Sequence, residues 1–465
     1  MKYISTRGEA PSLGFCDALL AGLGRDGGLY VPAEWPSFTK KEIRAMRGKS
    51  YQEIAFTVLT PFIDGEIPDE KFRAMIDEAY ATFRHPAIAP IVQTGPNAFI
   101  MELFHGSTLA FKDVAMQLLG RLMDYVLTQR NERATIVGAT SGDTGGAAID
   151  AFAGRDRTDI FILFPHGKVS PVQQRQMTTS TASNVHALAI NGNFDDCQSL
   201  VKDMFNDVTF RDSVALSGVN SINWARIMAQ IVYYFTTALA LGGPDRMVSF
   251  TVPTGNFGDI FAGYVARQMG LPIDKLVVAT NENDIVARTL ETGRYEMRDV
   301  KATSSPSMDI QISSNFERLL FEAYGRDASK VRGAMANLKQ SGSFEIEDDA
   351  LKSIRKVFRA GRATEKEVAK TIAKTLETTG YLLDPHTAIG VFVANKHETS
   401  SVPMVTLATA HPAKFPAAVK SASGIDPALP TWLANLMVRE ERFDVLDAEL
   451  KAVETFINER ARIRK

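Results

Sequence analysis

Residues 134–152 read ATIVGATSGDTGGAAIDAF, and this stretch decides the fold class of the chain. Its first part, residues 134–140, is a short β-branched run that predicts a strand. Glycines and small polar residues follow, and residues 144–152 predict a helix that leaves the turn. A strand that runs through a glycine turn into a helix is the repeating unit of parallel α/β sheets.

A second unit of the same kind lies further along the chain. Residues 247–252 predict a strand, a glycine turn follows at 253–259, and residues 260–269 predict a helix. Other segments alternate in the same way, with strands expected at 98–103, 159–164, 185–190, 276–279 and 402–408, and helices at 112–127 and 220–241. This alternation predicts an α/β fold of parallel sheets flanked by helices on both faces.

The N-terminal part of the chain has a different pattern. Residues 51–59 and 69–83 carry apolar residues at helical spacing, and prolines break the pattern near 85–95. We therefore expect a mainly helical N-terminal domain over residues 1–92, followed by an α/β region over 93–465.

Two charged segments lie within the α/β region. Residues 326–379 predict a charged helical insert that packs on the outside of the sheet. Residues 439–465 predict one charged amphipathic helix whose charges form a solvated face.

Composition argues against several classes of function. The 465 residues carry 52 basic and 54 acidic side chains, which does not indicate a nucleic-acid-binding surface. Cys16 and Cys197 form neither a disulfide framework nor a zinc ligand set, so a reducing cytoplasmic compartment is the simplest interpretation. The N-terminus shows no secretory signal, and the longest apolar stretch, 231–241, is too short to span a membrane. No H-E-x-x-H, paired cysteine motif or G-x-S-x-G occurs, so we expect neither a metal site nor acyl-serine chemistry.

Both glycine turns have the features of anion-binding sites. A helix N-terminus leaves backbone N–H groups without partners, and its dipole attracts negative charge. Glycine lets an anion approach the backbone closely. Ordinary strand-to-helix turns remain an alternative for either turn alone. The first turn is not a Walker A loop, because no lysine follows its glycines. Residues 255–258 lack the G-x-G-x-x-G spacing of a dinucleotide-binding fold. Binding of a mononucleotide stays open.

Lys112 is the candidate nucleophile. It lies at the head of an expected helix among apolar residues, and an ammonium that loses hydration has a lowered pKa. Such a lysine can attack an aldehyde. The local sequence alone also fits the commoner case of a surface lysine paired with Asp113.

Other polar residues lie near predicted strand ends or helix starts. Thr409 and Lys414 follow the strand at 402–408, where ligands bind in open α/β sheets. Arg175 lies on an expected helix start, and a surface ion pair is its simplest alternative role. His386 stands between a turn and a helix, where a single histidine is more often structural than catalytic.

Six motifs together resemble the threonine synthase family. They occur in the family's order and span nearly the whole chain, at 3–8 (YISTRG), 26–32 (DGGLYVP), 105–113 (HGSTLAFKD), 140–145 (TSGDTG), 255–259 (GNFGD) and 384–388 (DPHTA). The resemblance implies the fold-type-II architecture of the tryptophan synthase β subunit, with two subdomains and pyridoxal 5'-phosphate as cofactor.

The resemblance also implies roles for individual residues. Lys112 would form the covalent link to the cofactor, and Thr409 would hydrogen-bond its ring nitrogen. Asp143 would contact the ring hydroxyl, where the wider fold has Asn, so the protonation of this contact stays open. The cofactor phosphate would bind Gly255, Asn256, Phe257, Gly258 and Asp259. The substrate carboxylate would face Thr140, Ser141, Gly142 and Thr144, and the substrate phosphate would contact Arg175 and Lys414.

The expected reaction converts O-phospho-L-homoserine and water to L-threonine and phosphate, the last step of threonine biosynthesis. We expect a cytoplasmic monomer or homodimer that binds neither nucleic acid nor membrane. Two alternatives remain at this stage. One is a fold-type-II dehydratase, which would act without a substrate phosphate. The other is a non-catalytic small-molecule-binding protein, which would give Lys112 no role.

Overall fold

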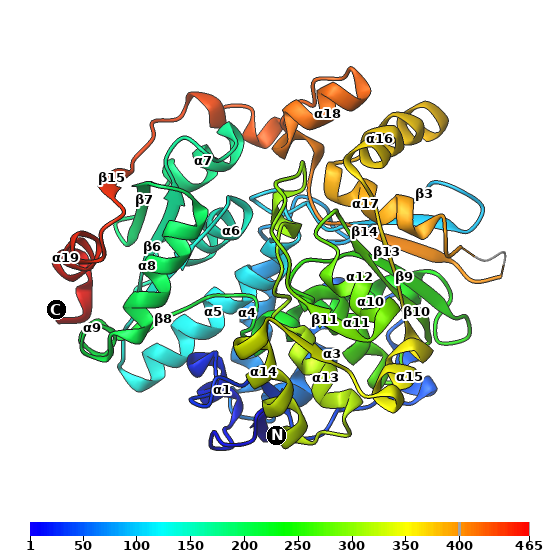
Figure 1. Cartoon of the computed structure of the whole chain (residues 1–465), viewed down its shortest axis with the longest axis horizontal. Coiled ribbons are helices and arrows are strands. Elements are labelled where there is room, and N and C mark those ends of the chain that lie inside the picture. Colours follow the sequence, from blue (N-terminus) through cyan, green and yellow to red (C-terminus); the bar gives the residue numbers. More distant parts are fainter. Residues whose placement is uncertain (399–400, 465) are drawn as a thin grey trace.

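The computed structural model describes residues 1–398 and 401–464 and contains two large sheets, one in each half of the molecule, besides two pairs of short antiparallel strands (Figure 1). The larger sheet has the strand order β13-β10-β9-β14-β4-β3, and only the β3–β4 pair is antiparallel. Its strands are β3 (Ile91–Gln93), β4 (Ala98–Glu102), β9 (Val248–Pro253), β10 (Ile273–Thr280), β13 (Phe358–Arg362) and β14 (Met404–Ala408).

The smaller sheet is parallel throughout, in the order β15-β7-β6-β5-β8. Its strands are β5 (Ala134–Ala139), β6 (Thr158–Pro165), β7 (Val185–Asn191), β8 (Leu216–Ser217) and β15 (Asp444–Asp447). Because helices cover both faces of each sheet, the central strands are almost continuously buried, as in β6. The predicted α/β class is confirmed.

Four helices surround the interface between the halves. They are α5 (Lys112–Arg130), α6 (Asp143–Phe152), α10 (Trp224–Ala240) and α11 (Gly258–Gln268). Helix α10 packs against α3 (Tyr51–Ile63), α5 and α11, so it is apolar on nearly every side. Its helical prediction is confirmed, although the helix begins at Trp224, where the Asn223 side chain accepts a hydrogen bond from the N–H of Ala225.

The N-terminal segment contains the two expected helices and a small antiparallel pair of strands. The Tyr3 hydroxyl of β1 donates to the carbonyl of Phe62 in α3, which fixes the strand pair to the helices. The elements are β1 (Tyr3–Ser5), α1 (Phe15–Ala21), β2 (Tyr30–Pro32), α2 (Lys40–Ala45), α3 (Tyr51–Ile63) and α4 (Asp69–Tyr80). This segment shares one continuous apolar core with α5, α10 and α11.

The charged stretch 326–379 is not purely helical. Strand β13 within it pairs in parallel with β10 and forms one edge of the larger sheet. The stretch holds α14 (Ala328–Ser341), β12 (Ser343–Glu345), α15 (Asp348–Val357), β13 and α16 (Glu365–Thr379). The expectation that all of it lies outside the sheet was therefore wrong for β13.

The C-terminal prediction also needs correction. Residues 439–465 do not form one helix, because β15 pairs with Leu188–Asn191 of β7 before α19 (Leu450–Arg460) begins. The pairing of backbone groups with a sheet edge outweighs the helical preference of these charged residues. Helix α19 then packs on α8 (Phe194–Asn206).

The remaining helices connect the sheets or cover them. They are α7 (Pro171–Thr178), α8 (Phe194–Asn206), α9 (Val208–Ser213), α12 (Ile285–Thr292), α13 (Phe316–Ala323), α17 (Pro385–Ala394) and α18 (Pro416–Ser423). The short elements are β11 (Arg294–Glu296) and the 3₁₀ turns η1 (Pro306–Met308), η2 (Pro412–Lys414), η3 (Thr431–Leu433), η4 (Leu436–Val438) and η5 (Arg462–Arg464).

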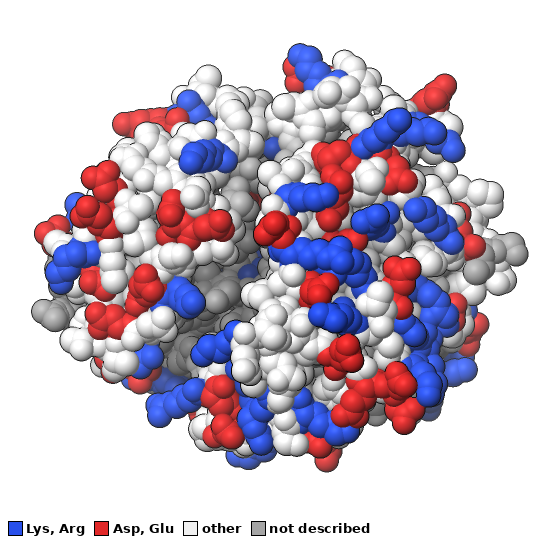
Figure 2. Space-filling view, viewed as in Figure 1, with Lys and Arg blue, Asp and Glu red and all other residues white. Residues whose placement is uncertain are grey.

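The surface is hollowed between the two halves, with acidic and basic side chains interspersed on both sides (Figure 2). Among the helices of the described residues, none has the length and apolar character needed to cross a bilayer. The carboxyl ends of β5 and β14 both lead to this interface, and the residues that follow them meet there around Asp143.

Candidate active site

Lys112 is the first residue of α5 and is held at the end of β14. The N–H of Phe111 donates to the carbonyl of Thr409 at 2.9 Å, and Ala110 bridges Ala410. These contacts place the side chain of Lys112, which is only 8% exposed, at the interface of the halves. Its ammonium lies 3.3 Å from Ser307 Oγ and 3.6 Å from Asp143 Oδ2.

The surroundings of Lys112 favour the neutral amine. Burial lowers the pKa of its ammonium, and the nearby cations Lys414 and Arg226 lower it further, while Asp143 raises it only in part. The expectation of a buried lysine with a lowered pKa is confirmed. A surface lysine paired with Asp113 is excluded, because Asp113 instead accepts the N–H and hydroxyl of Thr108 at 2.8 and 2.6 Å.

Asp143 lies between two buried lysines. Burial alone would raise the pKa of its carboxyl, but Lys414 and Lys112 outweigh that effect and lower it, so the group is ionised. Its Oδ1 accepts from Lys414 Nζ and Gln173 Nε2, both at 2.9 Å, and its Oδ2 accepts from Ser307 Oγ at 3.1 Å. The geometry therefore favours a carboxylate at a position whose protonation the sequence left open.

Lys414 is fully buried, and its ammonium has three partners. Besides Asp143, it donates to the carbonyl of Thr108 at 2.6 Å and to Gln176 Oε1 at 3.0 Å. An ammonium has three donors, so all of them are occupied by protein groups. This cation neutralises Asp143 and would have to change partners to contact a substrate phosphate.

The hydroxyl of Thr140 stabilises the first glycine turn. This hydroxyl accepts the N–H groups of Gly142 and Gly145, both at 2.9 Å, at the start of α6. Gly142 has φ +141, which a residue with a side chain rarely adopts. Ser141 and Thr144 remain partly exposed, so their polar groups are available to a ligand.

The second glycine turn forms the N-terminus of α11. Phe257 takes a left-handed conformation with φ 64, and the helix begins at Gly258. The hydroxyl of Ser313 donates to the carbonyl of Gly255 at 2.6 Å, which fixes the turn. A Cβ on Gly255 would lie 2.7 Å from the carbonyl oxygen of Ser307, so only glycine fits between the turn and the Ser307 loop.

Asp259 follows in the first turn of α11. Burial raises the pKa of its carboxyl to about 7. Its Oδ1 accepts the N–H of Ile260 at 2.8 Å, and its Oδ2 is buried without a partner in the described residues. A carboxyl that is readily protonated here can sit beside an anion with little repulsion.

Arg226 is a buried cation that the sequence interpretation missed. It is 4% exposed in the first turn of α10, and its Nη1 donates to the carbonyl of Val219 at 3.0 Å. The Nε of Arg226 has no partner, and no carboxylate pairs with the guanidinium in the described residues. Burial lowers the pKa of Arg226 to about 10. The sequence does mark Arg226, because every other residue of α10 is uncharged.

Two further residues at the site were missed or set aside. Ser307 belongs to η1, a loop without a recognisable motif, so only the structure brings it to Lys112. The Nδ1 of His386 lies 2.9 Å from Asp384 Oδ1, and its buried Nε2 has no partner in the described residues. This histidine influences Asp143 through its charge when protonated.

Thr409 and Arg175 have different surroundings. Thr409 is 6% exposed at the end of β14, next to the segment that carries Lys112. Arg175 of α7 instead donates to the carbonyl of Arg439 at 2.5 Å and lies 3.4 Å from Glu441. In the described chain, none of its hydrogen bonds or ion pairs reaches Lys112.

These residues fit pyridoxal 5'-phosphate. The phosphate needs an anion site that backbone N–H groups line closely, and the Gly255 turn at the N-terminus of α11 provides one. The aldehyde needs a desolvated amine, and Lys112 provides it. In the described residues, no group of three or more histidine, cysteine or carboxylate side chains could hold a metal ion.

Three family models match the sequence. "Threonine synthase N terminus" matches residues 2–80, "Pyridoxal-phosphate dependent enzyme" matches residues 83–409, and "Threonine synthase, C-terminal" matches residues 387–457. The second match alone covers well over half of the chain.

Individual relatives agree with the family models. A threonine synthase of Pseudomonas aeruginosa is 54% identical over 99% of this chain and 98% of its own length. The pyridoxal-phosphate-bound threonine synthase of Brucella melitensis is 69% identical, with a TM-score of 0.98 over 99% of this chain and 100% of that one. The yeast enzyme is 41% identical, with a TM-score of 0.94 over 99% and 98%. The chain belongs to the threonine synthase family of pyridoxal-phosphate-dependent enzymes.

Proposed function

We propose that the site around Lys112 converts O-phospho-L-homoserine and water to L-threonine and phosphate. One observation supports this proposal above all: the desolvated amine of Lys112 lies close to several separate sites that can each bind an anion. Lys112 lies between the Thr140 and Gly255 turns, and the buried cation Arg226 acts on it electrostatically. The fold is type II, and pyridoxal 5'-phosphate is the cofactor.

Lys112 is proposed both to attach the cofactor and to move protons. When bound, pyridoxal 5'-phosphate supplies an aldehyde for amines and an electron-withdrawing ring. The lowered pKa of Lys112 lets its nitrogen take a proton from the substrate α carbon and return one later. Ser307 and Asp143 orient this nitrogen through contacts of 3.3 and 3.6 Å.

The cofactor is proposed to lie between the two turns. Gly255, Asn256, Phe257 and Gly258 would hold its phosphate through backbone N–H groups, and Asp259 would stay protonated beside it. The roles of Asp143 at the ring hydroxyl and Thr409 at the ring nitrogen follow the family resemblance. An ionised Asp143, anchored by Lys414, would accept a hydrogen bond from the ring hydroxyl.

The two anionic groups of the substrate would bind on opposite sides of the reacting carbons. The backbone of the Thr140 turn, with the partly exposed Ser141 and Thr144, is the proposed carboxylate site. Arg226 is the proposed phosphate ligand, since a buried guanidinium without a carboxylate partner is strongly stabilised by a bound anion. Arg175 is less suited, because Glu441 already pairs with it.

The direct test supplies O-phospho-L-homoserine to the purified enzyme and measures phosphate and threonine together. The proposal predicts equal amounts of both, and a loss of both in Arg226→Gln. The matched control Arg442→Gln removes a cation from an exposed ion pair with Glu440 and leaves the rate unchanged. Deamination of serine or threonine without phosphate release would favour the dehydratase instead.

We further propose that the enzyme works in the cytoplasm as a monomer or homodimer. The charge balance and the two unpaired cysteines support this setting. We also propose the division into an N-terminal domain over residues 1–92 and a cofactor-binding region of two subdomains over 93–465. The two separate sheets support the pair of subdomains.

A further inference from the structure

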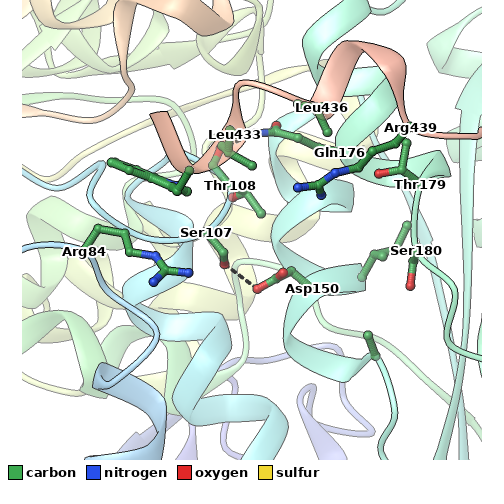
Figure 3. A pocket seen from close by; sticks show the side chains of 13 residues that line it. Arg84, Ser107, Thr108, Asp150, Gln176, Thr179, Ser180, Leu433, Leu436 and Arg439 are labelled. Carbon is green, nitrogen blue, oxygen red and sulfur yellow. Dashed lines mark hydrogen bonds between the residues drawn. The ribbon is translucent and has the colours of Figure 1, made fainter. Parts of the chain in front are cut away.

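A cavity with a volume of about 270 Å³ opens beside the active site (Figure 3). Its walls come from four parts of the chain: Arg84 in the loop after α4, the segment before α5, the helices α6 and α7 with the residues just after them, and the C-terminal segment around η3 and η4. Segments far apart in the sequence therefore build one pocket. Its volume is close to that of small ligand sites in proteins.

This pocket is distinct from the site at Lys112. Neither Lys112, Asp143 nor Lys414 is among its lining residues. The wall between the two sites contains Thr108 and Gln176, which line the pocket and also accept hydrogen bonds from Lys414 at 2.6 and 3.0 Å. The pocket thus adjoins the active site without containing its reactive groups.

Two cations face the pocket without carboxylate partners. The Arg84 guanidinium makes no hydrogen bond or ion pair in the described part of the chain. The Arg439 guanidinium donates only to the amide oxygen of Asn435, at 2.8 and 3.1 Å. Both side chains point into the cavity, from opposite sides (Figure 3). They offer a site for a carboxylate, which guanidinium groups bind well.

A single carboxylate, Asp150, lies between the arginines (Figure 3). Its Oδ2 accepts from the hydroxyl of Ser107 and from Gln117 Nε2, the latter at 2.5 Å. Its Oδ1 has no partner among the described residues. This second oxygen is therefore available to a ligand cation such as an ammonium.

The rest of the lining combines hydroxyl and amide side chains with an apolar wall on one part of the cavity. The apolar wall consists of Ile149 of α6, Ala153 just after that helix, and Trp432, Leu433 and Leu436 of the C-terminal segment. The two leucines are buried in a small cluster that fixes this segment in place. An apolar wall of this kind suits a short aliphatic side chain rather than a bare inorganic ion.

We propose that this pocket binds a free α-amino acid with a small aliphatic side chain. The arginines take its carboxylate, Asp150 Oδ1 takes its ammonium, and the leucine wall takes its side chain. The inference stands on the pocket alone and does not depend on the proposed reaction. Thr108 and Gln176 line the pocket and also accept hydrogen bonds from Lys414, so only these two residues separate the ligand from the buried cation of the active site.

The test titrates the holoenzyme with L-valine in a calorimeter while the absorption of the cofactor is followed. The inference predicts saturable binding that leaves the cofactor spectrum unchanged. It also predicts that 3-methylbutanoate, which lacks the ammonium, and isobutylamine, which lacks the carboxylate, bind roughly tenfold or more weakly, as expected for losing a charge-assisted contact.

Variants identify the residues that bind the ligand. Arg439→Gln, Arg84→Gln and Asp150→Asn should each weaken valine binding roughly tenfold, while the control Arg442→Gln binds like the wild type. Binding that persists in an Arg84→Gln, Arg439→Gln double variant would overturn the inference. Binding of 3-methylbutanoate as tight as that of valine would also overturn it. The same holds if valine and threonine bind only in a way that changes the cofactor spectrum, because such binding occurs at the active site.

Discussion

Two buried lysines share one carboxylate at the centre of this enzyme, and their surroundings differ. Lys414 makes three contacts of 3.0 Å or less and has no exposed surface. Lys112 makes two longer contacts, to Ser307 and Asp143, and keeps some access to the interface. Burial lowers the pKa of the Lys112 ammonium, whereas protein acceptors occupy all three donors of the Lys414 ammonium. This difference makes Lys112 the reactive amine and Lys414 the structural cation.

The structural role of Lys414 predicts a large loss of stability in Lys414→Met. Removing one member of a buried ion pair leaves Asp143 uncompensated, which costs about 3–5 kcal/mol. Denaturant unfolding of the variant and the wild type measures this difference. Lys420→Met is the matched control, because Lys420 pairs with Asp426 on the surface, and its effect should stay within about 0.5 kcal/mol. Equal effects of the two variants would contradict the assigned role.

Sequence patterns predicted individual residues only where a motif surrounds them. Lys112 and the Gly255 turn lie in recognisable motifs, and the structure places both at the interface of the halves. Ser307 lies in a loop without a motif, and its contact with Asp143 depends on tertiary structure that local sequence does not encode. Arg226 carried a signal, a lone charge on an apolar helix, which was overlooked.

At the scale of elements, the glycine turn before α11 depends on a close approach of two backbones. Gly255→Ala would place a methyl group 2.7 Å from the carbonyl oxygen of Ser307. The loop that carries Ser307 must shift, which costs about 1–3 kcal/mol of folding stability. The Ser307 hydroxyl would then move away from Lys112 and Asp143. We predict weaker cofactor binding and lower stability, measured by cofactor titration and by thermal unfolding.

Gly333→Ala is the matched control for this substitution. Gly333 lies inside α14 with open space around it, so alanine there should stabilise the helix by about 1 kcal/mol. Cofactor affinity should not change. An unaltered cofactor affinity in Gly255→Ala would show that the turn does not need this close approach.

Helices and strands with strong periodicity could be predicted from the sequence, and weakly periodic ones could not. The predictions for α3, α5 and β9 are confirmed because their apolar patterns match their burial. Strands β13 and β15 were missed, since both lie at sheet edges in charged surroundings. Their pairing depends on a neighbouring strand supplied by a distant part of the chain.

For the whole molecule, Asp259 gives stability a dependence on pH. Its pKa is raised by burial from 3.8 to about 7 in the folded protein. Between these values the folded state keeps a proton that the unfolded chain has lost, so its contribution to stability falls as the pH rises from about 4 to about 7. Asp259→Asn cannot titrate and should lack this contribution.

Apoprotein unfolding at several pH values measures this effect. The difference in unfolding free energy between Asp259→Asn and the wild type should move in favour of the variant as the pH rises through this window. A difference that is constant from pH 4 to pH 7 would show that Asp259 is not held in a protonation-sensitive site.

Lys112 lies where the two halves of the molecule meet, and its nitrogen is the proposed attachment point of the cofactor. Borohydride reduction of the holoenzyme, followed by peptide mass spectrometry, identifies the lysine that carries the cofactor. We predict one modified residue, Lys112, and an unmodified Lys414, although both amines lie against Asp143. A label on Lys414, or no labelled lysine in a protein that still makes threonine, would contradict this prediction.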